Sequence, residues 1–269
     1  MRRATGATST TLAAGLILAG CGEGLLGDSI DDLVRNGIND DGGSGVALSW
    51  DAEQSPDLAI STEGIASFGR NYDDVDTDYS IQREGDRADA EVLRTASGEL
   101  EVVLDDGSTY NKSISNDVAS RNVVARENAG GKWNLDQVSI YEGRSEDGET
   151  EIVRVTVMWG DHTVVFDDLD ALHDVGVLTF APGEEITVTV EANDSDVVGV
   201  IHQLTADVTP LSQRLLDPVN ATELRNVYNA PDEAGRYFTY VDLFDHEAIT
   251  DETSPYSAAA WGMPYHVEP

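Results

Sequence analysis

The feature that most constrains the fold is a two-residue alternation of apolar and polar side chains in the second half of the chain. Every second residue of 186–192 is apolar, and the residues between them are threonine or glutamate. Residues 153–159 and 261–267 follow a similar period. Side chains of a β-strand point alternately to its two faces, so the pattern predicts strands with one buried face.

Residues 142–269 contain about seven candidate strands and no convincing helix, which is typical of an antiparallel sandwich. Turn-forming residues separate the strands, as in Ala181-Pro182-Gly183-Glu184. We therefore predict an antiparallel β-sandwich over residues 142–269. Besides the three alternating segments, its strands are expected at 164–166, 197–201, 224–228 and 235–243.

Residues 46–141 are patterned less regularly. Moderate apolar content predicts a strand near 46–50 and a helix within 58–68. Turns are expected at 105–107 and 128–131, because their glycines tolerate positive φ. We predict either a small α+β region or an antiparallel sheet. The clearer strands are expected at 90–94, 100–104, 113–114, 121–126 and 133–140.

The N-terminus has the layout of a secretory signal peptide. Arg2 and Arg3 follow the initiator methionine, residues 4–20 carry no charge, and residues 12–19 form an apolar core. This apolar run is too short to span a bilayer, which needs about 20 apolar residues. We predict that residues 1–20 are a signal peptide; the arginine pair leaves general and twin-arginine export both open.

The end of this segment, Leu18-Ala19-Gly20-Cys21, resembles the lipobox of prokaryotic lipoproteins. The resemblance implies that Cys21, the only cysteine, receives a diacylglyceryl thioether and becomes the first mature residue. A buried cysteine is the alternative. The protein is then expected to be exported and anchored in the outer membrane or cell surface through this lipid. Residues 21–45, rich in glycine and aspartate, are predicted to be a flexible tether.

The charge of the chain limits its partners. It carries 51 acidic and 16 basic residues, for a net charge of −35, and this acidic, lysine-poor composition resembles that of proteins from extreme halophiles. The resemblance implies a fold that gains stability in high salt, where the repulsion between surface acids is screened. The regular alternation argues against a disordered acidic protein. Nucleic acid is excluded as a partner, because binding it requires basic residues that neutralise phosphates.

Two segments resemble known folds. Residues 231–242, an Ala-Gly-Arg-Tyr turn that leads into an alternating strand, resemble the late strands of immunoglobulin-like domains in bacterial surface proteins. Residues 46–141 end in Lys132-Trp133-x-Leu135-x-x-Val138-Ser139 and show a weaker resemblance to the nuclear-transport-factor-two-like cone. This second resemblance implies a helix packed on a curved antiparallel sheet.

Acidic residues supply the few candidate metal ligands, and calcium is the one cofactor considered. Asp74-x-Asp76-x-Asp78 has the alternating carboxylates of a calcium loop, but Tyr79 stands where that loop needs glycine. Asp242, Asp245 and His246 form another group that could meet a cation. The five histidines show no metal-type spacing, and no motif of catalytic serine, cysteine or zinc enzymes occurs.

These observations favour a non-enzymatic, exported, lipid-anchored surface protein used for binding or display, with a protein or carbohydrate partner that the sequence does not identify. One alternative is a carbohydrate- or cation-binding accessory module, and another is a hydrolase with a carboxylate pair. An aromatic group near the C-terminus either stacks on sugars or fills the sandwich core. Its members are Tyr237, Phe238, Tyr240, Phe244, Tyr256, Trp261 and Tyr265.

Overall fold

The computed structural model describes residues 49–51, 64–205 and 210–269. This part of the chain is mainly β-structure, which confirms the predicted fold class, and α2 (His246–Thr250) is its only helix. The strands are β1 (Ser49–Asp51), β2 (Ile65–Glu84), β3 (Arg87–Leu104), β4 (Thr109–Glu127), β5 (Trp133–Val138), β6 (Tyr141–Ser145), β7 (Ile152–Trp159), β8 (His162–Phe166), β9 (His173–Asp174), β10 (Thr179–Phe180), β11 (Glu185–Ala192), β12 (Val197–Thr205), β13 (Pro210–Leu215), β14 (Asp217–Pro218), β15 (Glu223–Asn229), β16 (Gly235–Asp245) and β17 (Ala258–Val267).

The strands form two sheets. The larger has 12 strands and follows the order β1-β2-β3-β4-β6-β17-β16-β12-β13, with β5, β9 and β10 attached beside this path. The smaller has five strands in the order β14-β15-β11-β7-β8. Paired strands are antiparallel except β10, which runs parallel to β17. One core contains residues of both sheets, so the fold is sandwich-like and compatible with an immunoglobulin-like domain.

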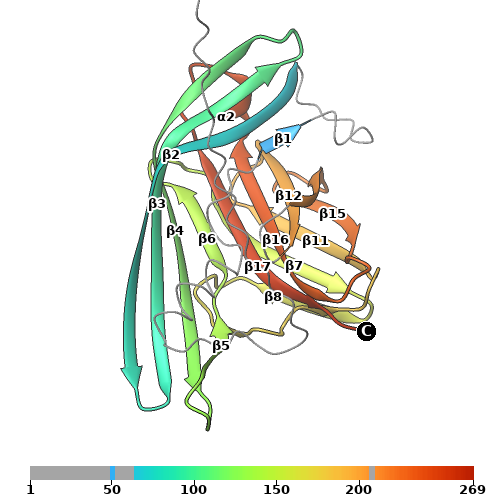
Figure 1. Ribbon diagram of the computed structural model, residues 1–269. Coiled ribbons are helices and arrows are strands. Elements are labelled where there is room, and N and C mark those ends of the chain that lie inside the picture. Colours follow the sequence, from blue (N-terminus) through green and yellow to red (C-terminus); the bar gives the residue numbers. More distant parts are fainter. Residues whose placement is uncertain (1–48, 52–63, 206–209) are drawn as a thin grey trace, which may run out of the picture.

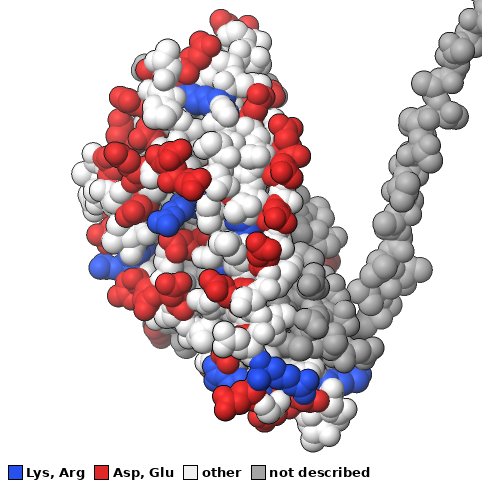
Figure 2. Space-filling model, turned by 90° about the vertical axis from the view of Figure 1, so that its left-hand side faces the viewer, with Lys and Arg blue, Asp and Glu red and all other residues white. Residues whose placement is uncertain are grey.

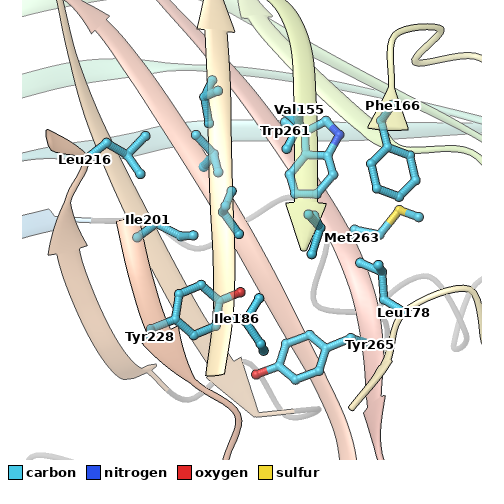
Figure 3. Close-up of a cluster of buried hydrophobic side chains, with 14 of the residues drawn as sticks. Val155, Phe166, Leu178, Ile186, Ile201, Leu216, Tyr228, Trp261, Met263 and Tyr265 are labelled. Atoms are coloured by element: carbon cyan, nitrogen blue, oxygen red, sulfur yellow. The ribbon is translucent and has the colours of Figure 1, made fainter. Parts of the chain in front are cut away.

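This sandwich core is built from the alternating residues. Ile186, Val188 and Val190 of β11 are fully buried, as their pattern predicts. They belong to the same apolar cluster as Trp261 and Tyr265 of β17, as Figure 3 shows. Since neither of these aromatic side chains is exposed, the last strand is part of the core.

Strands β16 and β17 are buried on both faces, which the alternation did not indicate. Their odd-numbered side chains, such as Val241, enter the sandwich core, whereas Phe244 and Ala258 belong to a second core. The second core exists because the larger sheet curls. The ring centroids of Phe68 in β2 and Phe244 in β16 lie 5.0 Å apart, although four strands, β3, β4, β6 and β17, separate β2 from β16 in the sheet.

A ribbon of three long strands, β2, β3 and β4, makes this curl. The strand register shifts between Tyr72 and Asp74 in β2, and between Ala96 and Gly98 in β3. Glycine is required at position 98, because a Cβ there would lie 2.0 Å from the carbonyl oxygen of Asn71. Figure 1 shows one end of the ribbon bending over α2 and the other end projecting as hairpins.

Lys112 fastens the bent end of the ribbon to α2. It is one of two lysines in the chain, and its side chain is almost completely buried. Its ammonium group donates hydrogen bonds to the main-chain carbonyl oxygens of Asp251 and Ser254, the latter at 2.6 Å. Asp251 is the C-cap of α2 and Ser254 lies in the turn after it, so the lysine joins the ribbon to the segment that follows the helix.

The first part of the folded chain is an antiparallel sheet rather than an α+β region in the residues described. Residues 65–68 of the expected helix lie in β2, and residues 58–63 lie outside the described ranges. The strands expected at 90–94 and 100–104 are one continuous strand, β3. No helix occurs between residues 64 and 141, so the structure lends the cone resemblance no support.

One prediction within the sandwich was wrong in detail. The period in β7 places Val153 on the buried face, but Val153 is 44% exposed and Ile152 is buried. The pairing of β7 with β11 shifts register between Glu191 and Ala192, which is a β-bulge. A bulge inserts one extra residue, so the side chains beyond it change faces.

The larger sheet runs across residue 141, where we expected a domain boundary. Ala119 of β4 pairs with Gly143 of β6, and Gly143 pairs with Ala260 of β17. Whether 46–141 and 142–269 fold separately stays a prediction. The signal peptide, Cys21 and the tether lie outside the described residues. Within the described ranges, no helix combines the length and apolar character needed to cross a bilayer.

Candidate functional site

A partly open cavity lies inside the curl of the larger sheet. Its volume of about 40 Å³ gives room for roughly three water molecules. Side chains from the ribbon and from β6, β12, β16 and β17 surround it, and its walls contain most of the buried charges of the second core. The residues that line it are Arg70, Tyr72, Arg94, Ala96, Asp117, Val118, Ala119, Tyr141, Gly143, Arg144, Ser145, Leu204, Tyr240, Tyr256 and 258–260.

A buried ion pair links the two sides of the curl. The guanidinium of Arg70 in β2 donates a hydrogen bond of 2.7 Å to Oδ1 of Asp242 in β16, and both side chains are buried. Burial alone would lower the pKa of Arg70, but the charge of Asp242 keeps this pKa well above its usual value. Burial likewise opposes ionisation of Asp242, yet Arg70 and His202 together lower its pKa. The pair is therefore charged at neutral pH.

His202 of β12 completes this part of the network. Its Nε2 lies 3.5 Å from Oδ2 of Asp242, which is long for a hydrogen bond. The imidazole is almost fully buried and lies beside Tyr240, with 6.4 Å between the ring centroids. Arg70 also stacks over Phe244, at 4.5 Å from the ring centroid. Packing and charge together hold the guanidinium in one position.

The hydrogen-bond chain continues from Arg70 to Asp117 in β4. Arg70 Nε donates to the Tyr256 hydroxyl at 2.6 Å, and that hydroxyl donates to Asp117 Oδ2 at 2.9 Å. Tyr72 donates to the same oxygen at 2.6 Å. Burial raises the pKa of Tyr72 and of Tyr256 far above the ordinary tyrosine value, so both hydroxyls stay protonated and act as donors.

The other oxygen of this carboxylate is unsatisfied. Oδ1 of Asp117 is buried and accepts no hydrogen bond from any residue that the structure describes. Arg70 Nε lies 3.7 Å from Asp117 Oδ2, so the nearest cation does not reach Oδ1 as a donor. Asp117 is a lining residue of the cavity, and a buried carboxylate oxygen without a partner frequently marks a missing donor.

Small side chains make room for this cavity. Asp117 is paired with Ala96 of β3, and Ala119, two residues further on the same face, is paired with Gly143. A Cβ at Gly143 would lie 3.3 Å from that of Ala260. Larger residues at these positions would fill the space between the ribbon and β17.

The sequence pointed to other acids for a cation site. Asp74, Asp76 and Asp78 lie in the extended strand β2, are exposed, and are paired with Ser97, Thr95 and Leu93 of β3. A calcium loop instead curls its carboxylates around one ion, so this segment does not have the predicted form. Among the described residues, no group of three or more His, Cys, Asp or Glu side chains is placed to hold a metal ion.

The residues of the second predicted acidic group have separate roles. Asp242 belongs to the buried ion pair. Asp245 caps α2 by accepting hydrogen bonds from the main-chain nitrogens of Glu247 and Ala248. His246 Nδ1 lies 3.6 Å from Asp196. These side chains do not converge on one point.

The aromatic group near the C-terminus fills the two cores. Phe238, Phe244 and Trp261 are at most 3% exposed, and the stacked rings of Tyr237 and Tyr265 are also buried. Tyr240 is the one member of the group that is not buried, so the group presents no row of exposed rings for stacking against a sugar. Tyr240 and Tyr256 are the two members that line the cavity.

A second recess, of about 170 Å³, lies on the opposite face of β6. Glu142, Arg144 and Glu151 line it. Burial raises the pKa of Glu142; Arg144 opposes this shift, and Asp170 and Glu151 add to it. Glu142 and Glu151 are one pair of carboxylates that the hydrolase alternative can use; Asp89, Glu91 and Asp170 line another recess, of about 270 Å³.

The surface outside the cavity is acidic, with one exception. Figure 2 shows acidic side chains spread over this side of the molecule, a group of basic ones at its lower end and single basic ones elsewhere. The hairpin tips of the ribbon carry ion pairs of Arg83 with Glu127, at 2.7 Å, and of Arg87 with Asp89, at 2.6 Å. The bases at the tip thus have acidic neighbours, and they leave no large positive surface.

No protein-family model matches this chain, and no curated protein matches it either. The site therefore has to be interpreted from its own geometry. Sequence reasoning missed Arg70, Tyr72 and Asp117. A signal was present in β2, where Phe68, Arg70 and Tyr72 share one face at period two, so that a charged residue stands in an apolar row.

Proposed function

We propose that the protein is an exported lipoprotein, tethered through a lipid on Cys21, that binds a small polar ligand in the cavity inside the curled sheet. It acts by binding rather than by catalysis, at the outer membrane or cell surface. The immunoglobulin-like sandwich is the scaffold, and residues 21–45 hold it away from the lipid. The acidic composition supports a high-salt environment.

The observation that carries the binding site is the unsatisfied oxygen of Asp117. Oδ2 of Asp242 is likewise buried without a hydrogen bond from the described residues, but of these two carboxylates Asp117 is the one that lines the cavity. Buried polar atoms without partners are rare in folded proteins and frequently mark a missing ion, water or ligand. The rigid network around this atom fixes its position, as a binding site requires.

Filling the cavity tests the binding function. Ala119→Leu places a larger side chain on the cavity wall, and Ala181→Leu, at an exposed turn, is the matched control. The detergent-solubilised full-length protein is screened by thermal shift against small amines, polyols and carboxylates at constant ionic strength. We expect at least one class to raise the melting temperature of the wild type and of Ala181→Leu, but not of Ala119→Leu. Identical responses in all three proteins would contradict a ligand site in the cavity.

The anchor is tested separately. Metabolic labelling with a fatty-acid analogue should mark the wild type and leave Cys21→Ser unlabelled, because the only thiol of the chain is then absent. The labelled protein should also sediment with membranes. Equal labelling of the two proteins would refute the lipid anchor without affecting the cavity.

A further inference from the structure

The open edges of the two sheets differ in how they are protected. The strand order of the larger sheet ends in β1 and β13, and that of the smaller sheet ends in β14 and β8. The outer edge of an end strand leaves main-chain N–H and C=O groups without a partner strand. Proteins usually protect such an edge with proline, charged side chains, a bulge or a very short strand, so that no other chain pairs with it.

Three of these four edges have such protection. β1 has three residues and includes Asp51, and β14 has two residues, one of which is Pro218. β13 begins with Pro210 and carries Arg214, and its pairing with β12 is interrupted by a register shift. Each of these features opposes the addition of another strand.

β8 has none of these features. Its five residues, 162–166, are His-Thr-Val-Val-Phe, without a proline, a glycine or an acidic or basic side chain other than the histidine. Its pairing with β7 continues without a register shift. Val165 is 46% exposed, and threonine and valine are residues that favour strands. β8 is therefore the edge among these four that is suited to pairing with another chain.

The turn between β7 and β8 fixes the hydrogen-bonding pattern of this edge. Trp159 pairs with His162 across the two-residue turn 160–161, and Gly160 has a φ of +49°. In a hairpin of this kind the pair that closes the turn is hydrogen-bonded. Hydrogen-bonded and non-hydrogen-bonded pairs then alternate along the antiparallel ladder.

The outward main-chain groups of β8 follow from this alternation. His162, Val164 and Phe166 are in the hydrogen-bonded pairs with β7, so the N–H and C=O groups of Thr163 and Val165 point to the open edge. Among the described residues, the main chain of β8 makes hydrogen bonds only with β7. Two donors and two acceptors are thus available in the spacing that an added strand requires.

Acidic side chains lie at both ends of this edge. Asp161 precedes β8, Asp167 and Asp168 follow it, and all three are exposed. Neither Asp161 nor Asp167 forms an ion pair with a described residue. An added strand would place its two ends beside these acids, where basic side chains are attracted and acidic ones are repelled.

The same acids disfavour a second copy of this chain as the added strand. Antiparallel pairing of two β8 strands about Val164 would place Asp161 of each copy opposite Asp167 of the other. Like charges directly opposite each other are destabilising, and a net charge of −35 on each copy adds to the repulsion. The charges therefore favour a different chain with basic ends.

We propose that β8 is a docking edge for an extended segment of a partner protein, with an uncharged, β-branched centre and basic residues at both ends. The segment adds to the smaller sheet as a sixth strand and bonds to the outward groups of Thr163 and Val165. Its basic side chains lie beside Asp161 and Asp167. Main-chain hydrogen bonds supply affinity in this mode of binding, and side chains supply specificity. No residue of β8 lines the cavity, so this surface is separate from the proposed ligand site.

The first test uses synthetic peptides and the detergent-solubilised full-length protein at constant ionic strength. The probe is a fluorescent peptide with five alternating valines and threonines between two pairs of lysines. One control peptide carries glutamates instead of lysines. The other keeps the lysines but is N-methylated on all five central residues, which removes the N–H donors and keeps the charge. We expect the probe to bind at least tenfold more tightly than either control. Equal binding of the N-methylated peptide would overturn the proposal, because general attraction to an acidic protein would then explain the affinity.

Protein variants then place the peptide on β8. Val165→Pro removes an outward N–H and leaves the ladder with β7 in place, and Val165→Thr, which keeps the N–H, is the matched control. We expect Val165→Pro to lose at least tenfold in affinity for the probe and Val165→Thr to stay within twofold of the wild type. Unchanged binding by a folded Val165→Pro would overturn the proposal.

A second pair of variants tests the flanking charges and does not depend on the fold of Val165→Pro. Asp161→Asn/Asp167→Asn removes the two flanking acids, and Asp76→Asn/Asp78→Asn removes two exposed acids of β2 as a charge-matched control. We expect the first double variant to lose about fivefold in affinity for the probe and the second to bind like the wild type. Equal losses in the two would overturn the assignment to β8.

The outcomes separate this inference from the proposed function. Ala119→Leu should bind the probe like the wild type, because the cavity does not take part, so failure of the peptide experiments leaves the cavity site unaffected. Self-association of the wild type without peptide, abolished by Val165→Pro, would overturn the proposal and assign the edge to a second copy of the chain.

Discussion

The core on one face of β16 and β17 is mainly apolar, with a few neutral hydrogen bonds such as that between the Tyr228 and Thr239 hydroxyls, whereas the core on the other face contains buried charges. Val241 and Trp261 belong to the sandwich cluster on their side. One residue away in the chain, Tyr240 and Asp242 face the cavity and the ion pair. The same two strands therefore contribute to stability through odd-numbered residues and to the candidate site through even-numbered ones.

The two cores differ in how strictly they specify their residues. Apolar packing is non-directional and accepts substitutions of similar volume. A buried polar network depends on every partner, because each unpaired charge carries a desolvation cost. The polar core is thus the more specific of the two.

The largest expected effect is in the apolar core. Trp261→Ala removes a fully buried indole from the centre of the sandwich and should destabilise the protein by about 4–5 kcal/mol. Chemical denaturation of the full chain measures the change. Val153→Ala, at a side chain that is 44% exposed, is the control and should change the stability by less than about 0.5 kcal/mol. A small effect of Trp261→Ala would mean that β17 is not a core strand.

The second-largest effect is expected from a substitution that breaks the buried ion pair of the polar core. Arg70→Met keeps the apolar stem against Phe244 but leaves Asp242 buried without its partner, so the loss should be about 3 kcal/mol. The double variant Arg70→Met/Asp242→Leu removes both charges and should regain most of that loss. A double-mutant cycle measured by denaturation checks the coupling. If the single and double variants are equally unstable, the two charges are not coupled.

The smallest effect is a dependence on pH. The pKa of Asp242 is lower in the folded protein than in the unfolded chain, so folding favours its ionised form. This contribution to stability is complete above the pKa that Asp242 has in the unfolded chain, about 3.9. It is lost as the pH falls through the lower pKa that Asp242 has in the folded protein. Stability of the wild type should therefore fall more steeply below about pH 4 than that of Asp242→Asn. The control variant Asp78→Asn should follow the wild type; parallel curves for all three would mean that Asp242 does not contribute in this way.

The sequence predicted most of the sandwich because its signal is local. The alternation at 186–192 describes a strand with one buried face, and β11 has that form. Two features needed tertiary information. The bulge opposite Glu191 moves Ile152 inward, and the run from Thr95 to Gly98 continues β3 where composition indicated a break.

The candidate site was harder to predict than the fold. Arg70 and Asp117 are 47 positions apart, and Asp242 is more distant still, so no local spacing connects them. Their contact depends on the curl of the ribbon, which in turn depends on Gly98 and two register shifts. In a chain with 51 acidic residues, composition also gave no reason to select Asp117 over the exposed Asp74, Asp76 and Asp78.

The most direct measurement compares two adjacent residues of β16 that point to opposite cores. Stability, and affinity for the ligand class that the thermal-shift screen selects, are measured for Tyr240→Phe and Val241→Ala in the full-length protein. Tyr240→Phe should lower the affinity about threefold while stability changes by less than about 1 kcal/mol, because its hydroxyl has no partner in the described structure. Val241→Ala should lose about 2–3 kcal/mol of stability and keep its affinity. If Val241→Ala instead lost the affinity, or Tyr240→Phe lost the stability, the two faces of β16 would not have the separate roles assigned to them.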